Sequence, residues 1–541
     1  MSALQVPNLS PLVSDYLYRY EKVAGFYNGD FRDLQIIRNR TESYQSIDYH
    51  RKELTSILKE QNRGYGCGET TLANIDKLRQ DTTCAVVTGQ QVGLFSGPLY
   101  TIYKTLTAIK LADILNKRGD GYFVPVFWLA SEDHDIAEID HIDLLDKNNE
   151  AQRIRFELDD HDFQTPASKI LLTQDVSRCL DQLNELTHDS EFKGEVLSHL
   201  SEAYRPGRSF VEAFAMWMTR LFESFGVIFI DASHSGLKAF GKDIFAREID
   251  DVSPSTRIAR ETAESLRRDD YPIQVPLREG ILNLFLSEGR RLSIKFEGEV
   301  FFLEGSSSPL KKSELLSILD KEPFAFSPNV LLRSVYQDKI LPTAAYIGGP
   351  GEIAYFAQLK GVYEKYGVDM PVIYPRTSIS LVENKVNIVL TNFNLDVSDI
   401  WQNIDTTIKD ILIDLIPESL EESLLRARTN LERDFETISE ELDSVDPTLQ
   451  KAAETSLGKI KQQVEFLETK ILRAQKRQNE IVVQRLMKAK NNLHPGGRPQ
   501  ERVFNIVPFL FKYGYTIIEK LFREIDILDP DHQVLSLEDL D

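Results

Sequence analysis

Apolar and polar positions change their spacing along the chain, and the changes predict the elements of the core. From about residue 80, short β-branched or aromatic runs alternate with stretches whose apolar residues recur at helical spacing. Residues 85–88, 123–129, 226–231 and 371–376 predict strands, and 123–129 is apolar on both faces, as a central parallel strand is. Ser96-Gly97-Pro98 predicts the start of a helix between the first two strands. The alternation indicates an α/β fold built on a parallel sheet.

Two stretches interrupt this core. Residues 146–220 are mostly polar and helical in pattern, and residues 241–325 contain short alternating strands. We therefore expect the core to be assembled from residues 1–145, 221–240 and 326–380, with the two stretches as insertions.

After about residue 380 the pattern becomes that of a coiled coil. Apolar residues recur at spacings of three and four in two runs, which are Leu420, Leu424, Ala427, Leu431, Phe435, Ile438 and Leu442, and Leu457, Ile460, Val464, Leu467, Ile471 and Ala474. Asp446-Pro447 separates the runs, so residues 381–541 are expected to form a helical hairpin domain with a terminal helix near 509–525. An apolar seam wider than one partner helix covers favours a homodimer. The alternative is a hairpin folded back on its own core.

Composition narrows the class of protein. The chain has 541 residues, enough for two to four domains, and a formal net charge of −21. This acidic balance argues against nucleic-acid binding, which relies on Lys and Arg, and no apolar stretch is long enough to span a membrane. Three cysteines and no visible secretory signal are consistent with a cytoplasmic protein.

The first segment with chemical potential lies between a predicted strand and a helix. It runs from Thr88 to Tyr100 and contains Gln90, Gln91, Gly97 and Pro98. Such a junction presents backbone N–H groups and the positive end of a helix dipole to an anion. A tight structural turn would also explain the glycines, but it would not explain two adjacent amides.

The second segment, residues 128–141, begins at Trp128 where the apolar strand ends. Its cluster is Glu132, Asp133, His134 and Asp135, at the sheet edge where open α/β folds bind ligands. Carboxylates there can grip an ammonium group or act as bases. The structural alternative is that acidic residues stabilise a helix dipole. If the segment is helical, His134, Glu138 and His141 share a face and could hold a metal.

Three further places add candidates. Gly349, Gly351 and Glu352 surround a proline before a predicted helix and form a potential anion nest. Asp231 ends the 226–231 strand at the same rim. Arg498 and Arg502 follow the coiled coil and suit phosphate or carboxylate groups, although salt bridges would use them equally well.

Several of these motifs together resemble one known family. They are Thr88-Gly89-Gln90-Gln91 with Gly97-Pro98-Leu99-Tyr100, Pro125-Val126-Phe127-Trp128 with Glu132-Asp133-His134-Asp135, Gly349-Pro350-Gly351-Glu352, and Gln500-Glu501-Arg502. In this order, spread over nearly the whole chain, they resemble the cysteine-adding enzymes of bacillithiol biosynthesis. The resemblance implies a Rossmann-like, nucleotidyltransferase-like core with connecting-peptide insertions and a helical coiled coil that pairs subunits.

The resemblance also implies an activity, an amide-forming ligase that joins cysteine to the glucosamine amine of glucosaminyl-malate. Because this condensation is uphill in water, the cysteine carboxylate requires activation, and ATP, with Mg²⁺ as its companion, is the expected donor; the chain has no standard ATP motif and no resident metal is expected. We expect Glu132, Asp133, His134 and Asp135 to orient the amine and accept its proton. Binding of the substrates is expected to involve Gln90, Gln91, Gly97, Pro98, Tyr100, Trp128, Asp231, Gly349, Gly351 and Glu352, with Arg498 and Arg502 as candidates for a nucleotide.

Two other functions remain open from the sequence. The cluster over residues 132–141 could serve a metal-dependent hydrolase, and the whole chain could be a coiled-coil scaffold on an inactive α/β body. Bound stoichiometric zinc or manganese would indicate the hydrolase. Loss of function on replacing Asp133, with folding unchanged, would exclude the scaffold.

Overall fold

The computed structural model of the 541-residue chain describes residues 9–117, 121–133, 135–158, 165–288, 290–442 and 444–540. The chain forms two compact units. The first contains Met1–Leu381 and Pro499–Leu535, and the second is essentially Val382–Arg498. In the part of the chain that the structure describes, no helix combines the length and apolar character needed to cross a bilayer.

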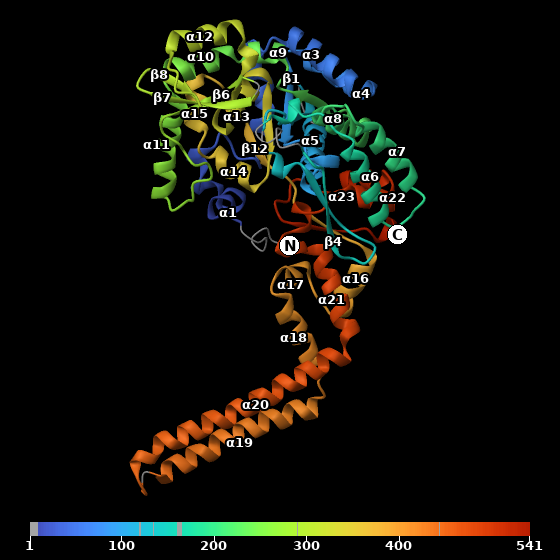
Figure 1. The fold of residues 1–541 in the computed structure, drawn as a ribbon, viewed down its shortest axis with the longest axis vertical. Coiled ribbons are helices and arrows are strands. Elements are labelled where there is room, and N and C mark those ends of the chain that lie inside the picture. The colour runs from blue at the N-terminus through green and yellow to red at the C-terminus, as the bar shows by residue number, and fades with distance from the viewer. Residues whose placement is uncertain are drawn as a thin grey trace. The chain divides into compact units, whose positions relative to one another are not determined.

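A five-stranded parallel sheet forms the centre of the first unit (Figure 1). Its strands are β1 (Thr83–Gln90), β2 (Tyr122–Leu129), β5 (Ile228–Asp231), β11 (Thr343–Gly348) and β12 (Val372–Pro375). They lie in the order β12-β11-β1-β2-β5, which is the strand order of the Rossmann fold. The parallel-sheet, Rossmann-like core expected from the sequence is confirmed.

Helices bury both faces of this sheet, as the almost fully buried residues of β1 and β2 require. The long helix α5 (Leu99–Asn116) packs on β1 and β2, while α2 (Leu34–Ser43), α3 (Arg51–Gly64) and α4 (Glu69–Leu78) also pack on the sheet strands. The predicted helix start is correct: α5 begins immediately after Pro98.

The remaining elements of the first unit lie before, between and after these strands. The region expected as the first insertion holds β3 (His141–Leu145, which begins before it), β4 (Ala151–Arg155), α6 (Asp175–Leu186), α7 (Lys193–Ala203) and α8 (Phe210–Leu221). The second region holds α10 (Lys242–Asp250), α11 (Pro254–Arg268), β6 (Ile281–Glu288), β7 (Arg290–Glu297), β8 (Val300–Leu303), β9 (Leu310–Lys311) and α12 (Lys312–Lys321), preceded by α9 (Ser235–Phe240) and followed by β10 (Phe326–Pro328). Strands β10-β6-β7-β8-β9 form one antiparallel sheet. Three helices follow this sheet in the sequence: α13 (Val330–Ile340), α14 (Pro350–Phe356) and α15 (Lys360–Tyr366). Near the other end of the unit, α1 (Pro11–Tyr18) is the first helix of the described chain.

The second unit is helical. It consists of α16 (Asn384–Asn392), α17 (Val397–Trp401), α18 (Ile404–Asp414), α19 (Glu418–Leu442), α20 (Gln450–Gln478) and α21 (Glu480–Leu493). Helices α19 and α20 run alongside one another as a long hairpin (Figure 1), linked by ion pairs such as Lys461 to Glu432 at 2.7 Å. The hairpin predicted from the apolar spacing is thus confirmed.

The sequence interpretation differs from the structure at two elements. Residues Thr343–Gly348 form the interior strand β11, which was not among the predicted strands. The terminal helix near 509–525 is two helices, α22 (Val507–Tyr513) and α23 (Thr516–Glu524), because Gly514 between them has φ of 65°. These helices and β14 (Gln533–Ser536), which pairs with β13 (Ile379–Val382), follow the return of the chain to the first unit at Pro499.

Candidate functional site

A cavity of about 520 Å³ lies at the carboxyl ends of the central strands. The chain leaves β1 toward β2 on one side, whereas β11 is the neighbour of β1 on the other side, so the strand order reverses between β1 and β11. Open α/β sheets bind ligands in the crevice at this point. The cavity has a volume suited to a small molecule.

Residues far apart in the sequence meet at this cavity. Of the residues predicted for the site, those that line it are Gln90, Gln91, Tyr100, Trp128, Glu132, Asp133, Gly349, Gly351, Glu352 and Arg502. They come from the ends of β1, β2 and β11, from α5, and from the segment that follows the return of the chain. The structure thus brings together the glutamine loop, the acidic cluster and the glycine-rich turn.

Two buried lysines hold two of the cavity glutamates. Lys104 forms an ion pair with Glu352 and donates to the Gly89 carbonyl at 2.8 Å. Lys238, whose side chain is fully buried, forms an ion pair with Glu132 at 2.6 Å. Burial lowers the pKa of both lysines, and the partner glutamate opposes that change in each case. Each glutamate is therefore fixed in place by a neighbouring ammonium.

Asp133 is held as a carboxylate facing the cavity. Its Oδ2 accepts a hydrogen bond of 3.0 Å from Gln91 Nε2, and its Oδ1 one of 3.3 Å from the Asp135 backbone N–H. Burial raises the pKa of Asp133, but the charge of Arg333 and the Gln91 hydrogen bond outweigh burial and leave the pKa below its usual value. Asp133 therefore stays ionised at neutral pH and can attract an ammonium group.

Four arginines supply positive charge to the cavity. Arg291, Arg333, Arg376 and Arg502 all line the cavity. Arg376 is bound on both terminal nitrogens by buried Glu501, at 2.5 and 2.7 Å. Arg291 donates to Ser327 Oγ and to the Pro328 carbonyl and covers the Phe285 ring.

Arg333 differs from Arg376. Within the described ranges, no carboxylate oxygen lies within 4 Å of its guanidinium nitrogens. A guanidinium that lines a cavity without a carboxylate partner is suited to bind an anionic ligand through paired hydrogen bonds.

Other predicted residues lie elsewhere. Gly97 and Pro98 do not line the cavity, because the segment at Phe504 and Asn505 covers the start of α5: the Leu99 N–H donates to the Phe504 carbonyl at 2.8 Å, and Asn505 Nδ2 donates to Gly97 O at 2.6 Å. The helix start is thus satisfied by protein groups rather than open to a ligand.

The rest of the predicted set also falls outside the lining. Asp231 accepts from the Ser131 hydroxyl and, at 2.9 Å, from the Ser233 N–H, so its Oδ1 caps the local turn. Asp135 is exposed. Arg498 belongs to the second unit. His134 lies outside the described residues.

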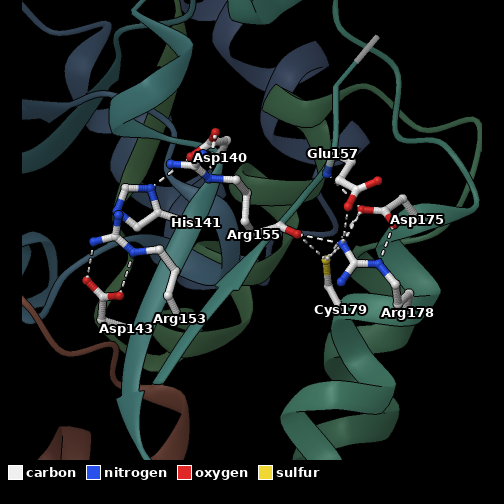
Figure 2. Close-up of polar contacts among 9 residues, drawn as sticks. All are labelled: Asp140, His141, Asp143, Arg153, Arg155, Glu157, Asp175, Arg178 and Cys179. Atoms are coloured by element: carbon white, nitrogen blue, oxygen red, sulfur yellow. Dashed lines mark hydrogen bonds and ion pairs between the residues drawn. The ribbon is translucent and has the colours of Figure 1, made fainter. Parts of the chain in front are cut away.

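The helical metal-binding face considered for residues 134–141 is not formed. Residues Ile136–Glu138 make one 3-10 turn and His141 begins β3. Figure 2 shows the His141 ring beside Asp140, with Nδ1 to Oδ1 at 2.8 Å, and Arg153 paired with Asp143 across the β3–β4 hairpin. Among the residues that the structure describes, no cluster of three His, Cys, Asp or Glu side chains could hold a metal. A shared metal-binding face required the segment to be helical, whereas the residues from His141 onward pair as a strand with β4.

Sequence reasoning missed several residues that the structure places at the site, namely Lys104, Lys238, Arg291, Arg333 and Arg376. Lys104 could have been noticed, because it is a charged residue among the apolar Ile102, Tyr103 and Leu106 of α5. Arg376 directly follows β12, and so shares the edge at which β1 and β2 end. Arg291 and Lys238 carry no such signal, since their placement depends on tertiary packing.

A Rossmann-order sheet with a small cavity of mixed charge at its switch point defines a small-molecule-binding α/β protein with an appended coiled coil. Two family models match the chain: "Bacillithiol biosynthesis BshC, N-terminal Rossmann-like domain" over residues 1–377 and "Bacillithiol biosynthesis BshC, C-terminal coiled-coil domain" over residues 379–537. The chain belongs to the bacillithiol biosynthesis BshC family.

Curated relatives agree with this assignment over nearly full length. The "Putative cysteine ligase BshC" of Salinibacter ruber is 37% identical, covering 97% of this chain and 96% of the relative. Proteins of the same name from Chloroherpeton thalassium and Geobacillus thermodenitrificans are 34% and 30% identical, covering 93% and 95% of this chain and 91% and 96% of their own lengths.

Proposed function

We propose that this protein is an amide-forming ligase that joins the carboxyl group of cysteine to the glucosamine amine of glucosaminyl-malate, which yields bacillithiol. Membership of the BshC family supports the reaction class. The observation that carries the assignment of substrate groups is that one cavity is lined both by the ionised carboxylate of Asp133 and by arginines. The acceptor carries the same two features, an amine and a dicarboxylate.

We assign the malate carboxylates to Arg333 and the amine to Asp133. Among the residues that the structure describes, none places a carboxylate oxygen within 4 Å of the Arg333 guanidinium, whereas Arg376 is already neutralised by Glu501. Asp133 is ionised, and Glu132 beside it is fixed by Lys238. Binding both groups at once would place the amine in a defined position for attack.

We further propose that ATP, with Mg²⁺, activates the cysteine carboxylate as an acyl phosphate or adenylate. The support is thermodynamic, because amide formation from a free carboxylate is unfavourable in water. Arg502 at the cavity wall is the candidate for contact with a phosphate. The free state of the three cysteines supports a reducing, cytoplasmic setting for this reaction.

Reconstitution tests the proposal. Purified protein with cysteine, glucosaminyl-malate and Mg·ATP is expected to form bacillithiol together with AMP or ADP, both followed by mass spectrometry. Bacillithiol without nucleotide turnover would overturn the ATP step alone. Absence of the thiol product under all nucleotide conditions would overturn the ligase assignment.

We also propose that two copies associate through the hairpin of α19 and α20. Within the described part of α20 no residue is buried, and Phe466 and Leu467 are 57% and 51% exposed although they lie in a coiled-coil helix. A second hairpin packed on this seam would convert the two-helix arrangement into a four-helix one with a covered core.

Replacing Phe466 and Leu467 together by glutamate is expected to convert a dimer into a monomer, because four charges would enter the seam of the paired hairpins. Light scattering coupled to size exclusion measures the mass, which should fall from twice the 61.9 kDa chain mass to that value. Val445, 74% exposed in the turn of the hairpin, provides the control: Val445→Glu should leave the dimer intact. A wild-type protein that is monomeric at micromolar concentration would contradict the proposal.

A further inference from the structure

The side-chain amide of Gln90 has an orientation that the protein determines. Lys104 Nζ donates to Gln90 Oε1 at 3.1 Å, and an ammonium can only donate. Only the oxygen of the Gln90 amide can therefore face Lys104. The Nε2 group must point the opposite way, and one of its two N–H groups donates to the Tyr100 hydroxyl at the cavity wall, at 3.2 Å. Gln90 consequently presents a donor, and not an acceptor, on the cavity side.

Lys104 is in turn held by groups from across the switch point. It is 2% exposed and forms its ion pair with Glu352. Glu352 also accepts hydrogen bonds from the Tyr346 hydroxyl at 2.7 Å and from the Gly349 N–H at 2.8 Å, which come from β11 and the start of α14. Because both oxygens of Glu352 are used by the protein, this carboxylate serves to fix Lys104 rather than to bind substrate.

The Gln90 donor lines the same cavity as Asp133, to which the amine is assigned. Gln91, the following residue, is hydrogen-bonded to Asp133 at 3.0 Å, which ties the glutamine loop to the acidic segment. An acyl group attacked by an amine held at Asp133 would lie in this cavity, where the Gln90 amide is one of the lining donors. A fixed neutral donor at that place is suited to the negative charge that develops on the oxygen.

We propose that Gln90 Nε2 stabilises the oxyanion formed during amide-bond formation, and that Lys104 is the positioning residue that fixes its direction. This inference rests on the proposed ligase function. In the step, the amine nitrogen attacks the acyl carbon of the ATP-activated cysteine, and the carbon–nitrogen bond forms as the carbonyl electron pair moves to oxygen. The nitrogen's proton passes to a carboxylate of residues 132–135. The electron pair then returns, and the bond to phosphate or AMP breaks.

Steady-state kinetics of Gln90→Met and Gln90→Glu test the donor. Both side chains keep the approximate shape of glutamine but lack the N–H group. Each variant is expected to lower kcat by about 100- to 1000-fold, the loss typical of removing one oxyanion donor, with KM for glucosaminyl-malate little changed. A raised KM with unchanged kcat would overturn the inference, because it would make Gln90 an ordinary binding residue.

The Lys104→Met variant tests positioning. Its loss in kcat is expected to equal that of Gln90→Met, and the double variant should lose no more than either single variant, because Lys104 acts through Gln90. If the loss in kcat of the double variant were the product of the two single losses, Lys104 would have only a structural role and its assignment would be overturned. Lys238→Met removes the buried lysine that pairs with Glu132 and is the matched control. Its loss in kcat should multiply with that of Gln90→Met in the double variant.

Two further results keep the test decisive. Where Lys104→Met does not fold by circular dichroism, Glu352→Gln serves in its place, since it loosens Lys104 while keeping hydrogen-bonding groups. If the wild type is active and Gln90→Met is equally active, this inference is overturned and the ligase proposal is not. A wild type that forms no bacillithiol overturns the ligase proposal, and this inference with it.

Discussion

Replacing Arg333 with glutamine is expected to raise the KM for glucosaminyl-malate by about 100-fold, because a guanidinium that pairs with a substrate carboxylate in a desolvated site contributes about 2 to 5 kcal/mol. The expectation follows from the absence of a protein carboxylate within 4 Å of Arg333 among the described residues, which leaves its charge for a ligand. Initial rates measured over a range of acceptor concentrations give the KM.

The acceptor itself provides the discriminating control. Free glucosamine has the amine but lacks the malate carboxylates, so the loss caused by Arg333→Gln should be much smaller with this acceptor than with glucosaminyl-malate. Arg278→Gln, at an arginine outside the cavity, should behave as wild type with both acceptors. An equal loss with both acceptors would indicate that Arg333 supports the fold or the activated cysteine, and would contradict its assignment to malate.

The Glu501→Gln substitution is expected to lower the free energy of unfolding of the first unit by about 3 to 5 kcal/mol. Glu501 and Arg376 are both almost completely buried, and removal of one charge leaves the other without compensation. Glu501 also accepts hydrogen bonds from Ser378 Oγ and from the Ile379 N–H, both at 3.0 Å. The substitution therefore also weakens the contacts of the chain segment that follows β12. Denaturant titration followed by tryptophan fluorescence measures the change.

An exposed pair supplies the control for Glu501. Glu223 pairs with Arg220 at 3.3 Å on the surface, and Glu223→Gln should leave stability within experimental error. If Glu501→Gln were as stable as wild type, the pair would be energetically neutral in the folded protein, contrary to the expectation.

The same ion pair predicts a dependence on pH. Burial raises the pKa of Glu501, but the charge and hydrogen bonds of Arg376 outweigh it and lower the pKa from 4.5 to about 2. Between these values the unfolded chain binds more protons than the folded protein, so the stabilisation is complete above the unfolded pKa and is lost as the pH falls toward 2. The stability difference between wild type and Glu501→Gln should therefore shrink over this acidic range.

Much of the fold could be predicted because its signals are local. Strand 123–129 is apolar on both faces and the helix after Pro98 has both a start signal and a periodic apolar face, so sequence and structure agree there. Strand β11 was missed because the glycines that end it resemble a loop, and because its two alanines have weak strand preference. The terminal pair of helices looked continuous because one glycine, Gly514, was read within a helical pattern.

The candidate site was predictable only where its residues follow strands. Gln90, Gln91 and Asp133 come at or just beyond the carboxyl ends of neighbouring strands, and parallel pairing brings such positions to one edge. Pro98 also follows a strand and precedes a helix, so the sequence placed it at the site. In the structure it is covered by Phe504 and Asn505, some 400 residues later in the chain.

By itself, the sequence determined the parallel core, the coiled-coil hairpin and the edge at which polar side chains collect, because periodicity and strand ends are properties of neighbouring residues. Only the tertiary structure decided which charges remain for a substrate. Arg376 is neutralised by Glu501, Glu132 by Lys238, and Glu352 by Lys104, whereas Arg333 has no such partner in the described chain. These pairings join segments distant in sequence, and the energy of a buried charge depends on what lies beside it in space.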